Sequence, residues 1–433
     1  MSNKPKVVDK KYLLPFLLIT SLFALWGFAN DITNPMVAAF KTIMEITNFK
    51  ASLIQFAFYG GYATMAIPAA LFIQKYSYKK GILLGLALYA VGALLFWPAA
   101  QFQGFEFFLG SLYILTFGLA FLETTANPFI LSLGSKETAT QRLNLAQAFN
   151  PMGSLIGMFV ASKVILASLE SDKQRNALGE LVFSSLDEAT KATIRSNDLM
   201  IIRNPYVALG LVVIFLLIVI ALVKMPQPSS TKKVDTKTSI KRLFKNRLYR
   251  TGVISQIFYV AAQIMCWTFI IQYAENLGLD KATAQNYNIV AMSLFLVSRF
   301  VCTFLMKYIN ARKLLMLFAF GGILMMLGTI FAQSIIGLYF LVAASAFMSL
   351  MFPTIYGIAL ENVGDDITMG SAFLVMAIVG GALMPPLQGA IIDLGSVGFL
   401  PAVNASFALP LISFCVVMVY GYTANKQLLS HKK

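Results

Sequence analysis

Residues 314–360, LLMLFAFGGILMMLGTIFAQSIIGLYFLVAASAFMSLMFPTIYGIAL, contain no charged side chain. A helix needs roughly 20 apolar residues to cross the hydrocarbon core of a bilayer. The stretch is therefore long enough for two crossings, and the more polar AQSIIG at 332–337 predicts the turn between them. This pattern indicates an all-α membrane protein.

The rest of the chain repeats the pattern. Hydrophobic residues make up 58% of the 433 residues, charged residues only 12%, and the mean hydropathy is +0.74, whereas soluble domains carry about 25% charged residues. The alternation of period two that a membrane barrel requires is missing from the sequence. Further charge-free runs bring the predicted total to about twelve spans: 12–30, 51–74, 81–105, 107–122, 143–162, 204–223, 251–274, 282–298, 367–392 and 394–425.

The placement of the positive charges predicts the topology. The net charge is +15, and if there are twelve spans, several clusters of Lys and Arg fall on one side, which the positive-inside rule makes the cytosol. Both termini are therefore expected to be cytosolic. These clusters are Lys4, Lys6, Lys10 and Lys11; Lys75, Lys79 and Lys80; Lys307, Arg312 and Lys313; and Lys426, Lys432 and Lys433.

A polar, basic segment divides the spans into two groups of six. We predict an N-terminal six-helix bundle over 1–225, a cytosolic linker over 226–250 and a C-terminal six-helix bundle over 251–433. Two such bundles are typical of a rocking transporter. A second polar segment, 169–203, is expected on the outer side, where SLDEATKATIRSN resembles a short surface helix.

The chain offers few groups for chemistry inside the membrane. Its three cysteines lie in apolar runs and are interpreted as packing residues. The one histidine, His431, lies in the tail, so we expect no histidine-based metal site in the membrane and no resident cofactor. Carboxylates are left to carry any proton.

Two carboxylates stand in otherwise apolar runs, Glu123 in GLAFLETTANPF and Asp31 in FANDITNP. A carboxylate at the bilayer centre costs about 2.5–3.5 kcal/mol even on lenient scales, so something must offset that cost. Glu123 shares a helical face with Asn127, and Asp31 shares one with Asn34. Two interpretations of Glu123 stay open, a protonatable functional group and a structural ion pair with Arg299.

Amide and aromatic side chains form stripes on three further spans. One buried amide alone is as readily explained by a hydrogen bond between helices. Several stripes together offer the paired donors and acceptors that sugar hydroxyls need, and aromatic faces suit a pyranose ring. The stripes are Asn144, Gln147 and Asn150 in the fifth span, Tyr259, Gln263 and Trp267 in the seventh, and Gln55, Tyr59 and Tyr62 in the second.

At these residues the chain resembles the fucose:proton symporter family of the major facilitator superfamily, which are sugar permeases of twelve helices. The resemblance covers nearly the whole chain and rests on uncommon motifs in the expected order. They are ITNFKASLIQFAFYGGY at 46–62, LLFWPAA at 94–100, FLETTANPF at 121–129, RLNLAQAFN at 142–150, YVAAQIMCW at 259–267, SAFMS and PTI within 345–355, and IVGGALMPP at 378–386.

The resemblance implies roles for individual residues. The membrane glutamate of the family falls on Glu123, and its sugar-contacting glutamine and asparagine fall on Gln147 and Asn150. The essential first-helix aspartate aligns with Asn34, whereas Asp31 occupies the place of an asparagine one turn earlier. We therefore predict that Glu123 and Asp31 couple the cation. The predicted substrate-binding residues are Asn34, Tyr62, Asn127, Gln147, Asn150, Tyr259, Gln263 and Trp267.

Together these features predict a secondary active sugar importer of the bacterial inner membrane that works by alternating access. It would carry L-fucose or a related hexose with a cation, in the first place a proton. The alternative that the family implies is a sodium-coupled transporter of glucose, galactose or N-acetylglucosamine. The expected partners are a monosaccharide and membrane lipid, without nucleic acid or an obligate protein partner.

Two other classes fit the sequence less well. A drug exporter of the same superfamily would have a mostly apolar pocket, which the amide stripes disfavour. An intramembrane enzyme would need a nucleophile with a base or a metal cluster, and the spans contain no histidine. The chain also lacks a GxxxxGK phosphate-binding loop, so ATP is not expected to drive it.

Overall fold

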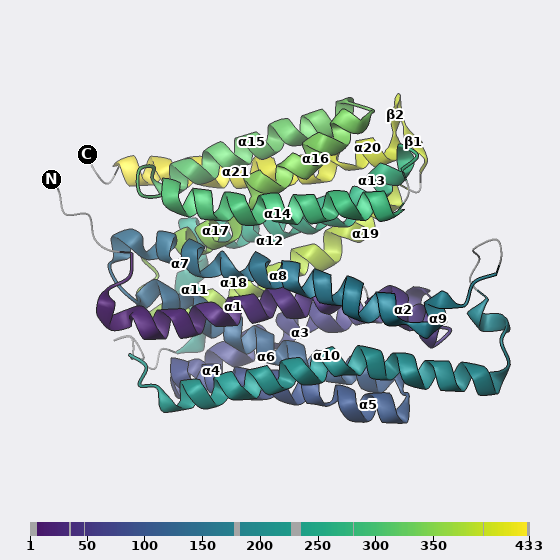
Figure 1. Ribbon diagram of the computed structural model, residues 1–433. Helices are drawn as coiled ribbons and strands as arrows, with labels where there is room; N and C mark the ends of the chain where they lie inside the picture. Colours follow the sequence, from purple (N-terminus) through teal and green to yellow (C-terminus); the bar gives the residue numbers. More distant parts are fainter. Residues whose placement is uncertain are drawn as a thin grey trace. The chain divides into compact units, whose positions relative to one another are not determined.

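A computed structural model describes residues 7–33, 36–46, 48–176, 182–226, 235–279, 281–392 and 394–430. These residues are mainly helical (Figure 1). Contacts between residues group the chain into two compact units. Unit 1 contains Met1–Thr20, Asn127–Pro151 and Pro228–Lys433, and unit 2 contains Ser21–Ala126 and Met152–Gln227.

Helices account for nearly all of the regular structure. The first ten α-helices are α1 (Leu13–Thr33), α2 (Met36–Ile43), α3 (Asn48–Lys75), α4 (Tyr78–Leu94), α5 (Phe96–Phe102), α6 (Phe105–Ser132), α7 (Ala139–Gln147), α8 (Phe149–Phe159), α9 (Glu170–Lys173) and α10 (Glu188–Leu222). The others are α11 (Thr236–Lys245), α12 (Arg247–Thr268), α13 (Ile270–Asn276), α14 (Lys281–Leu305), α15 (Ala311–Phe331), α16 (Ile335–Met348), α17 (Met351–Leu360), α18 (Ile367–Met376), α19 (Gly380–Ile392), α20 (Ala402–Ser406) and α21 (Ala408–Ser430). Strands β1 (Ser396–Val397) and β2 (Leu400–Pro401) form a short antiparallel hairpin.

Eleven helical segments of the described residues are long and apolar enough to cross a membrane. The long charge-free stretch forms two of them, as predicted. Helix α15 ends at Phe331, and α16 begins at Ile335. The Ser334 hydroxyl caps the start of α16 by accepting a hydrogen bond from the Ile336 N–H. The predicted span at 251–274 corresponds to α12 and α13, which are not among the eleven. Twelve spans and cytosolic termini therefore remain predictions.

Close contacts in unit 2 fix the position of α6. A β-carbon at Gly92 of α4 would lie 2.2 Å from the Leu115 nitrogen of α6, and one at Gly61 of α3 would lie 2.7 Å from Thr116. Only glycine allows the helices to approach so closely. The helix that carries Glu123 is thus held directly against α3 and α4.

The outer polar segment contains the start of a long helix. The sequence predicted a separate short helix at 185–197, but α10 continues for 35 residues to Leu222, about 52 Å at 1.5 Å per residue. The helix begins where the Asp187 carboxylate accepts a hydrogen bond of 2.9 Å from the Thr190 N–H. That bond lowers the pKa of Asp187 below its ordinary value.

Polar contacts hold this extension of α10 in place. The Lys191 ammonium lies 3.3 Å from Glu45, which follows α2, and Arg195 donates to the Ile43 carbonyl at 3.0 Å. The buried Asp198 carboxylate accepts hydrogen bonds from two backbone N–H groups at the start of α9. An ion pair and hydrogen bonds to backbone groups therefore hold this segment in place. The pattern of apolar residues in the sequence cannot predict such contacts.

The linker also contains a helix, α11, which belongs to unit 1. Its Arg242 guanidinium binds both carboxylate oxygens of Asp366, at 2.8 and 2.6 Å, and the Ser239 hydroxyl donates to the same group at 2.6 Å. Pairing with Asp366 raises the pKa of Arg242. Units 1 and 2 are defined by residue contacts and not as bundles of helices. They do not test the predicted boundaries at 225 and 250, which stay predictions.

Candidate functional site

Glu123 lies half-buried on α6 in unit 2. The Tyr62 side chain of the neighbouring helix α3, only 6% exposed, lies within electrostatic range of its carboxyl group. The close approach of α3 and α6 at Gly61 brings the two residues together. A change in the charge of Glu123 therefore acts electrostatically on Tyr62.

Asp31 has a similar environment on α1. Its side chain is buried, and the Tyr59 hydroxyl of α3 lies within electrostatic range. Tyr59 and Tyr62 are three residues apart on α3 and so share one face of that helix. The structure thus brings each predicted coupling carboxylate of unit 2 close to one tyrosine of the same short stretch.

The predicted amide residues of unit 1 form a direct pair. The Gln147 amide donates to the Asn127 oxygen at 2.8 Å, and both side chains are buried. The Arg299 guanidinium donates to the Gln147 carbonyl at 2.9 Å and to the Ser349 carbonyl at 2.5 Å, and it lies 4.5 Å from the centre of the Phe295 ring. Two backbone carbonyls therefore hold Arg299 in place.

The aromatic stripe on α12 divides into a core residue and more accessible ones. Tyr259 is fully buried, and its hydroxyl donates to the Met348 carbonyl at 3.1 Å. Trp267 is half-buried, donates from Nε1 to the Ser345 hydroxyl at 3.1 Å and meets the Phe295 ring edge-on at 5.0 Å. Gln263 is also half-buried. The position of Tyr259 suits packing, whereas Trp267 keeps part of its ring accessible.

The predicted site residues fall into both units. Unit 2 contains Asp31, Tyr62 and Glu123, and unit 1 contains Asn127, Gln147, Asn150, Tyr259, Gln263 and Trp267. Asn150 is half-buried at the start of α8, and Asn34 lies outside the described residues. Across the described ranges, no three His, Cys, Asp or Glu side chains are placed to hold a metal ion.

One buried charge was not predicted to matter. Arg142 on α7 is fully buried and donates to the carbonyls of Ile130 at 2.7 Å and Leu131 at 2.6 Å, near the end of α6. Its guanidinium also reaches the Ser135 and Val7 carbonyls. Arg142 therefore ties α7 to the end of α6. The available signal was a single arginine inside the RLNLAQAFN motif.

The same short helix binds two helices of the predicted C-terminal bundle. Gln141 donates to the Thr303 carbonyl of α14 at 2.9 Å, and Asn144 donates to the Thr354 hydroxyl of α17 at 3.1 Å. All of these groups belong to unit 1. Asn144 was predicted as part of an amide stripe, and its hydrogen bond between helices is the simpler of the two interpretations given to such stripes.

Comparisons with known proteins identify the family of the chain. The family model described as Major Facilitator Superfamily matches residues 17–377. An L-fucose-proton symporter of Haemophilus influenzae is 63% identical over 98% of this chain and 99% of its own. A glucose/galactose transporter of Brucella abortus is 30% identical over 96% of both chains. A crystal structure of the transporter FucP in the outward conformation has a TM-score of 0.86 and 34% identity, covering 96% of this chain and 99% of its own.

The chain belongs to the major facilitator superfamily, and within it to the family of sugar porters that includes the L-fucose-proton symporters. It is an integral protein of the bacterial inner membrane. The relatives named above are transporters.

Proposed function

We propose that the protein is a secondary active importer that carries L-fucose, or a closely related hexose, together with a proton. The observation that carries the proposal is the pair of carboxylates inside candidate membrane spans, Glu123 half-buried on α6 and Asp31 buried on α1. The activity named for the 63% identical relative supports the choice of sugar and ion.

Protonation of the carboxylates couples the ion to movement in this proposal. An ionised carboxylate is costly in apolar surroundings, whereas a protonated one is neutral and can form hydrogen bonds there. When a proton from outside binds to a carboxylate, the neutral group can be enclosed in apolar surroundings. Protonation therefore favours the conformational change by which the sugar-loaded protein closes to the outside and opens to the cytosol. Release of the proton to the cytosol restores the charge, so the proton gradient drives uptake.

The proposed sugar contacts come from amide and aromatic side chains. Gln147 and Asn127, already joined to each other, together with Asn150 and Gln263 provide donors and acceptors for hydroxyl groups. The accessible part of the Trp267 ring provides a flat apolar surface for the C–H side of a pyranose. The remaining proposed contacts are Asn34 and Tyr62. Tyr259, which the sequence also predicted as a contact, is fully buried, and its hydroxyl is bound to the Met348 carbonyl.

Uptake by proteoliposomes tests the proposal. Labelled L-fucose, D-glucose, D-galactose and N-acetylglucosamine are supplied in turn under an imposed proton gradient or an imposed sodium gradient. We expect concentrative uptake of L-fucose with the proton gradient alone, and its loss on adding a protonophore. Uptake of glucose or galactose that follows the sodium gradient would support the alternative named from the family.

The proposal requires no other chemistry. The coupling ion is the only co-substrate, with no organic cofactor, no resident metal and no ATP, and the protein is a carrier rather than an enzyme. Its proposed surroundings are membrane lipid, without nucleic acid or an obligate protein partner. Uptake by the purified protein in lipid vesicles tests these absences together, because every component is then defined.

A further inference from the structure

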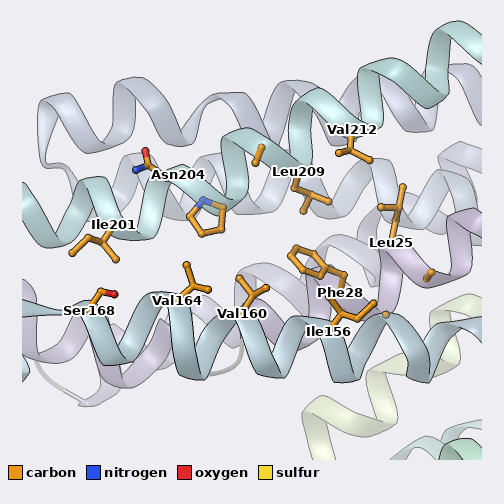
Figure 2. Close-up of a pocket in the computed structure, with 14 residues that line it drawn as sticks. Leu25, Phe28, Ile156, Val160, Val164, Ser168, Ile201, Asn204, Leu209 and Val212 are labelled. Carbon is orange, nitrogen blue, oxygen red and sulfur yellow. The ribbon is translucent and has the colours of Figure 1, made fainter.

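A long apolar groove crosses unit 2 between α10 on one side and α1 and α8 on the other (Figure 2). Its volume is about 700 Å³. Aliphatic and aromatic side chains point into it from both walls, among them Leu25, Phe28, Ile156, Leu209 and Val212. The wall on the α8 side continues through a π-helical turn, Val160–Ile165, a form that often occurs at functional sites.

The surroundings of the groove exclude water as its stable content. It lies on membrane-spanning segments, and Ile156 and Val212 are 57% and 48% exposed beside it. A water molecule needs two to four polar partners, which aliphatic walls do not provide. In a bilayer the available filler is hydrocarbon. Helix α10 lines the groove from Ile201 to Val212, about 16 Å, close to the depth of one leaflet of the roughly 30 Å hydrocarbon core.

One end of the groove is polar. Ser168 and Asn204 lie there, close to Ile201 (Figure 2). The Asn204 oxygen accepts hydrogen bonds from the Arg203 guanidinium at 3.1 and 2.9 Å, and that guanidinium lies 4.1 Å from the centre of the Trp97 ring. The oxygen is thereby occupied, which leaves the amide N–H₂ of Asn204 as a donor beside a fixed positive charge.

This end matches the chemistry of a phosphate headgroup. Guanidinium groups bind phosphate oxygens with charge-assisted hydrogen bonds. The exposed Lys163 precedes the groove-lining Val164 in the π-helical turn. Anionic lipids are attracted to basic side chains near a membrane surface.

We propose that the groove binds one acyl chain of an anionic phospholipid, with the phosphate at Arg203 and Asn204. The apolar walls take the chain, the length corresponds to one leaflet, and the basic end selects the headgroup. The site belongs to unit 2 alone, and it requires neither the sugar nor the coupling carboxylates. Its test is therefore independent of the transport proposal.

A pair of tryptophan substitutions on α10 tests the acyl-chain part. Ala208 lines the groove and is exposed, so Ala208→Trp fills the groove without displacing a core residue. Leu211→Trp is the matched control, because Leu211 is 59% exposed and does not line the groove. Native mass spectrometry of the purified protein counts bound phosphatidylglycerol. We expect Ala208→Trp to reduce binding about tenfold, because the apolar contact surface is lost, and Leu211→Trp to retain it.

Thermal unfolding of each variant accompanies the measurement. If Ala208→Trp does not fold, Val160→Trp fills the groove from the opposite wall and replaces it. Undiminished binding of phosphatidylglycerol by a folded groove-filling variant would overturn the proposal, as would equal losses in the variant and in Leu211→Trp.

A charge substitution tests the headgroup part. The unchanged protein should bind phosphatidylglycerol in preference to phosphatidylcholine with the same acyl chains. Arg203→Gln should remove this preference, and Arg203→Lys, which keeps the positive charge, should retain most of it. A protein that binds both lipids equally well before any substitution would overturn the assignment of an anionic headgroup.

Discussion

At the scale of single residues, the carboxylates decide whether the protein concentrates its substrate. We expect Glu123→Gln to abolish uptake against a gradient but to preserve exchange of labelled for unlabelled sugar. The amide keeps the shape and the hydrogen-bonding capacity of the protonated acid, but it cannot release a proton. Asp31→Asn should have the same effect if Asp31 shares the coupling role. Gradient-driven uptake and equilibrium exchange in vesicles measure the two activities separately.

The same helix provides a matched control for this experiment. Glu106 is 72% exposed on α6 and pairs with Lys50 at 2.7 Å. Exposed ion pairs contribute at most about 1 kcal/mol, so Glu106→Gln should leave uptake close to normal. Concentrative uptake by Glu123→Gln at the normal level would show that Glu123 is structural. Normal uptake by Asp31→Asn would leave Glu123 to act alone.

The sequence identifies the type of these residues better than their individual contacts. Glu123 and Asp31 could be selected because ionisable groups in apolar spans are rare, and each lies close to a tyrosine in the structure. Tyr259 and Trp267 have the same spacing pattern on α12, yet one hydroxyl is bound to the Met348 carbonyl and one ring remains half-exposed. Periodicity places side chains on a face, but neighbouring helices decide which of them stay accessible.

At the scale of elements, we expect the short helix α7 to hold the cytosol-closed state together. Gln141 and Asn144 bind α14 and α17, which are helices of the predicted C-terminal bundle. If the two predicted bundles separate on the cytosolic side during alternating access, these bonds must break. Each neutral hydrogen bond contributes about 1 kcal/mol net. The double variant Gln141→Ala with Asn144→Ala should therefore shift the population toward the cytosol-open state by about 30-fold, which corresponds to about 2 kcal/mol for the two bonds.

Alkylation of an introduced cysteine measures this shift. Thr140 lies against Gly357 of α17, where an added β-carbon would be 2.8 Å from the Thr140 hydroxyl oxygen. A Thr140→Cys thiol should react faster from the cytosolic side in the double variant, whereas Lys136→Cys, already exposed, should not change. Asn404→Ala serves as a control because it removes contacts to Tyr273 and the Thr329 carbonyl that do not involve α7. An unchanged rate at Thr140→Cys would contradict the prediction that the hydrogen bonds of α7 keep the cytosolic side closed.

Elements outside the apolar runs were the hardest to predict. The two helices of the stretch at 314–360 follow from hydrophobicity and a polar break, and the structure has them. The extension of α10 and the linker helix α11 depend instead on pairs distant in the sequence, such as Lys191 with Glu45 and Arg242 with Asp366. Composition alone cannot identify which charge pairs with which.

At the scale of the whole molecule, helix α12 decides the topology. It has 22 residues, about 33 Å at 1.5 Å per residue, which is enough to cross a core of roughly 30 Å. Arg247 and Arg250 in its first turn and Gln256 and Gln263 further along make it less apolar than the eleven other segments. If α12 crosses, the chain has twelve spans and both ends of the described chain lie on one side. If it does not, they lie on opposite sides.

Labelling with a membrane-impermeant maleimide distinguishes these topologies. Lys237→Cys before α12 and Lys426→Cys on α21 should react only in inside-out vesicles, whereas Asn276→Cys after α12 and Ala189→Cys on the outer part of α10 should react in intact cells. All four positions are exposed, and the native Cys266 and Cys302 are buried. The basic clusters favour a cytosolic position for both Lys237 and Lys426. Both positions can be cytosolic only if α12 crosses the membrane, so we expect α12 to be inserted although it is more polar than the other segments. Reaction of Lys426→Cys from outside intact cells would instead mean an odd number of crossings.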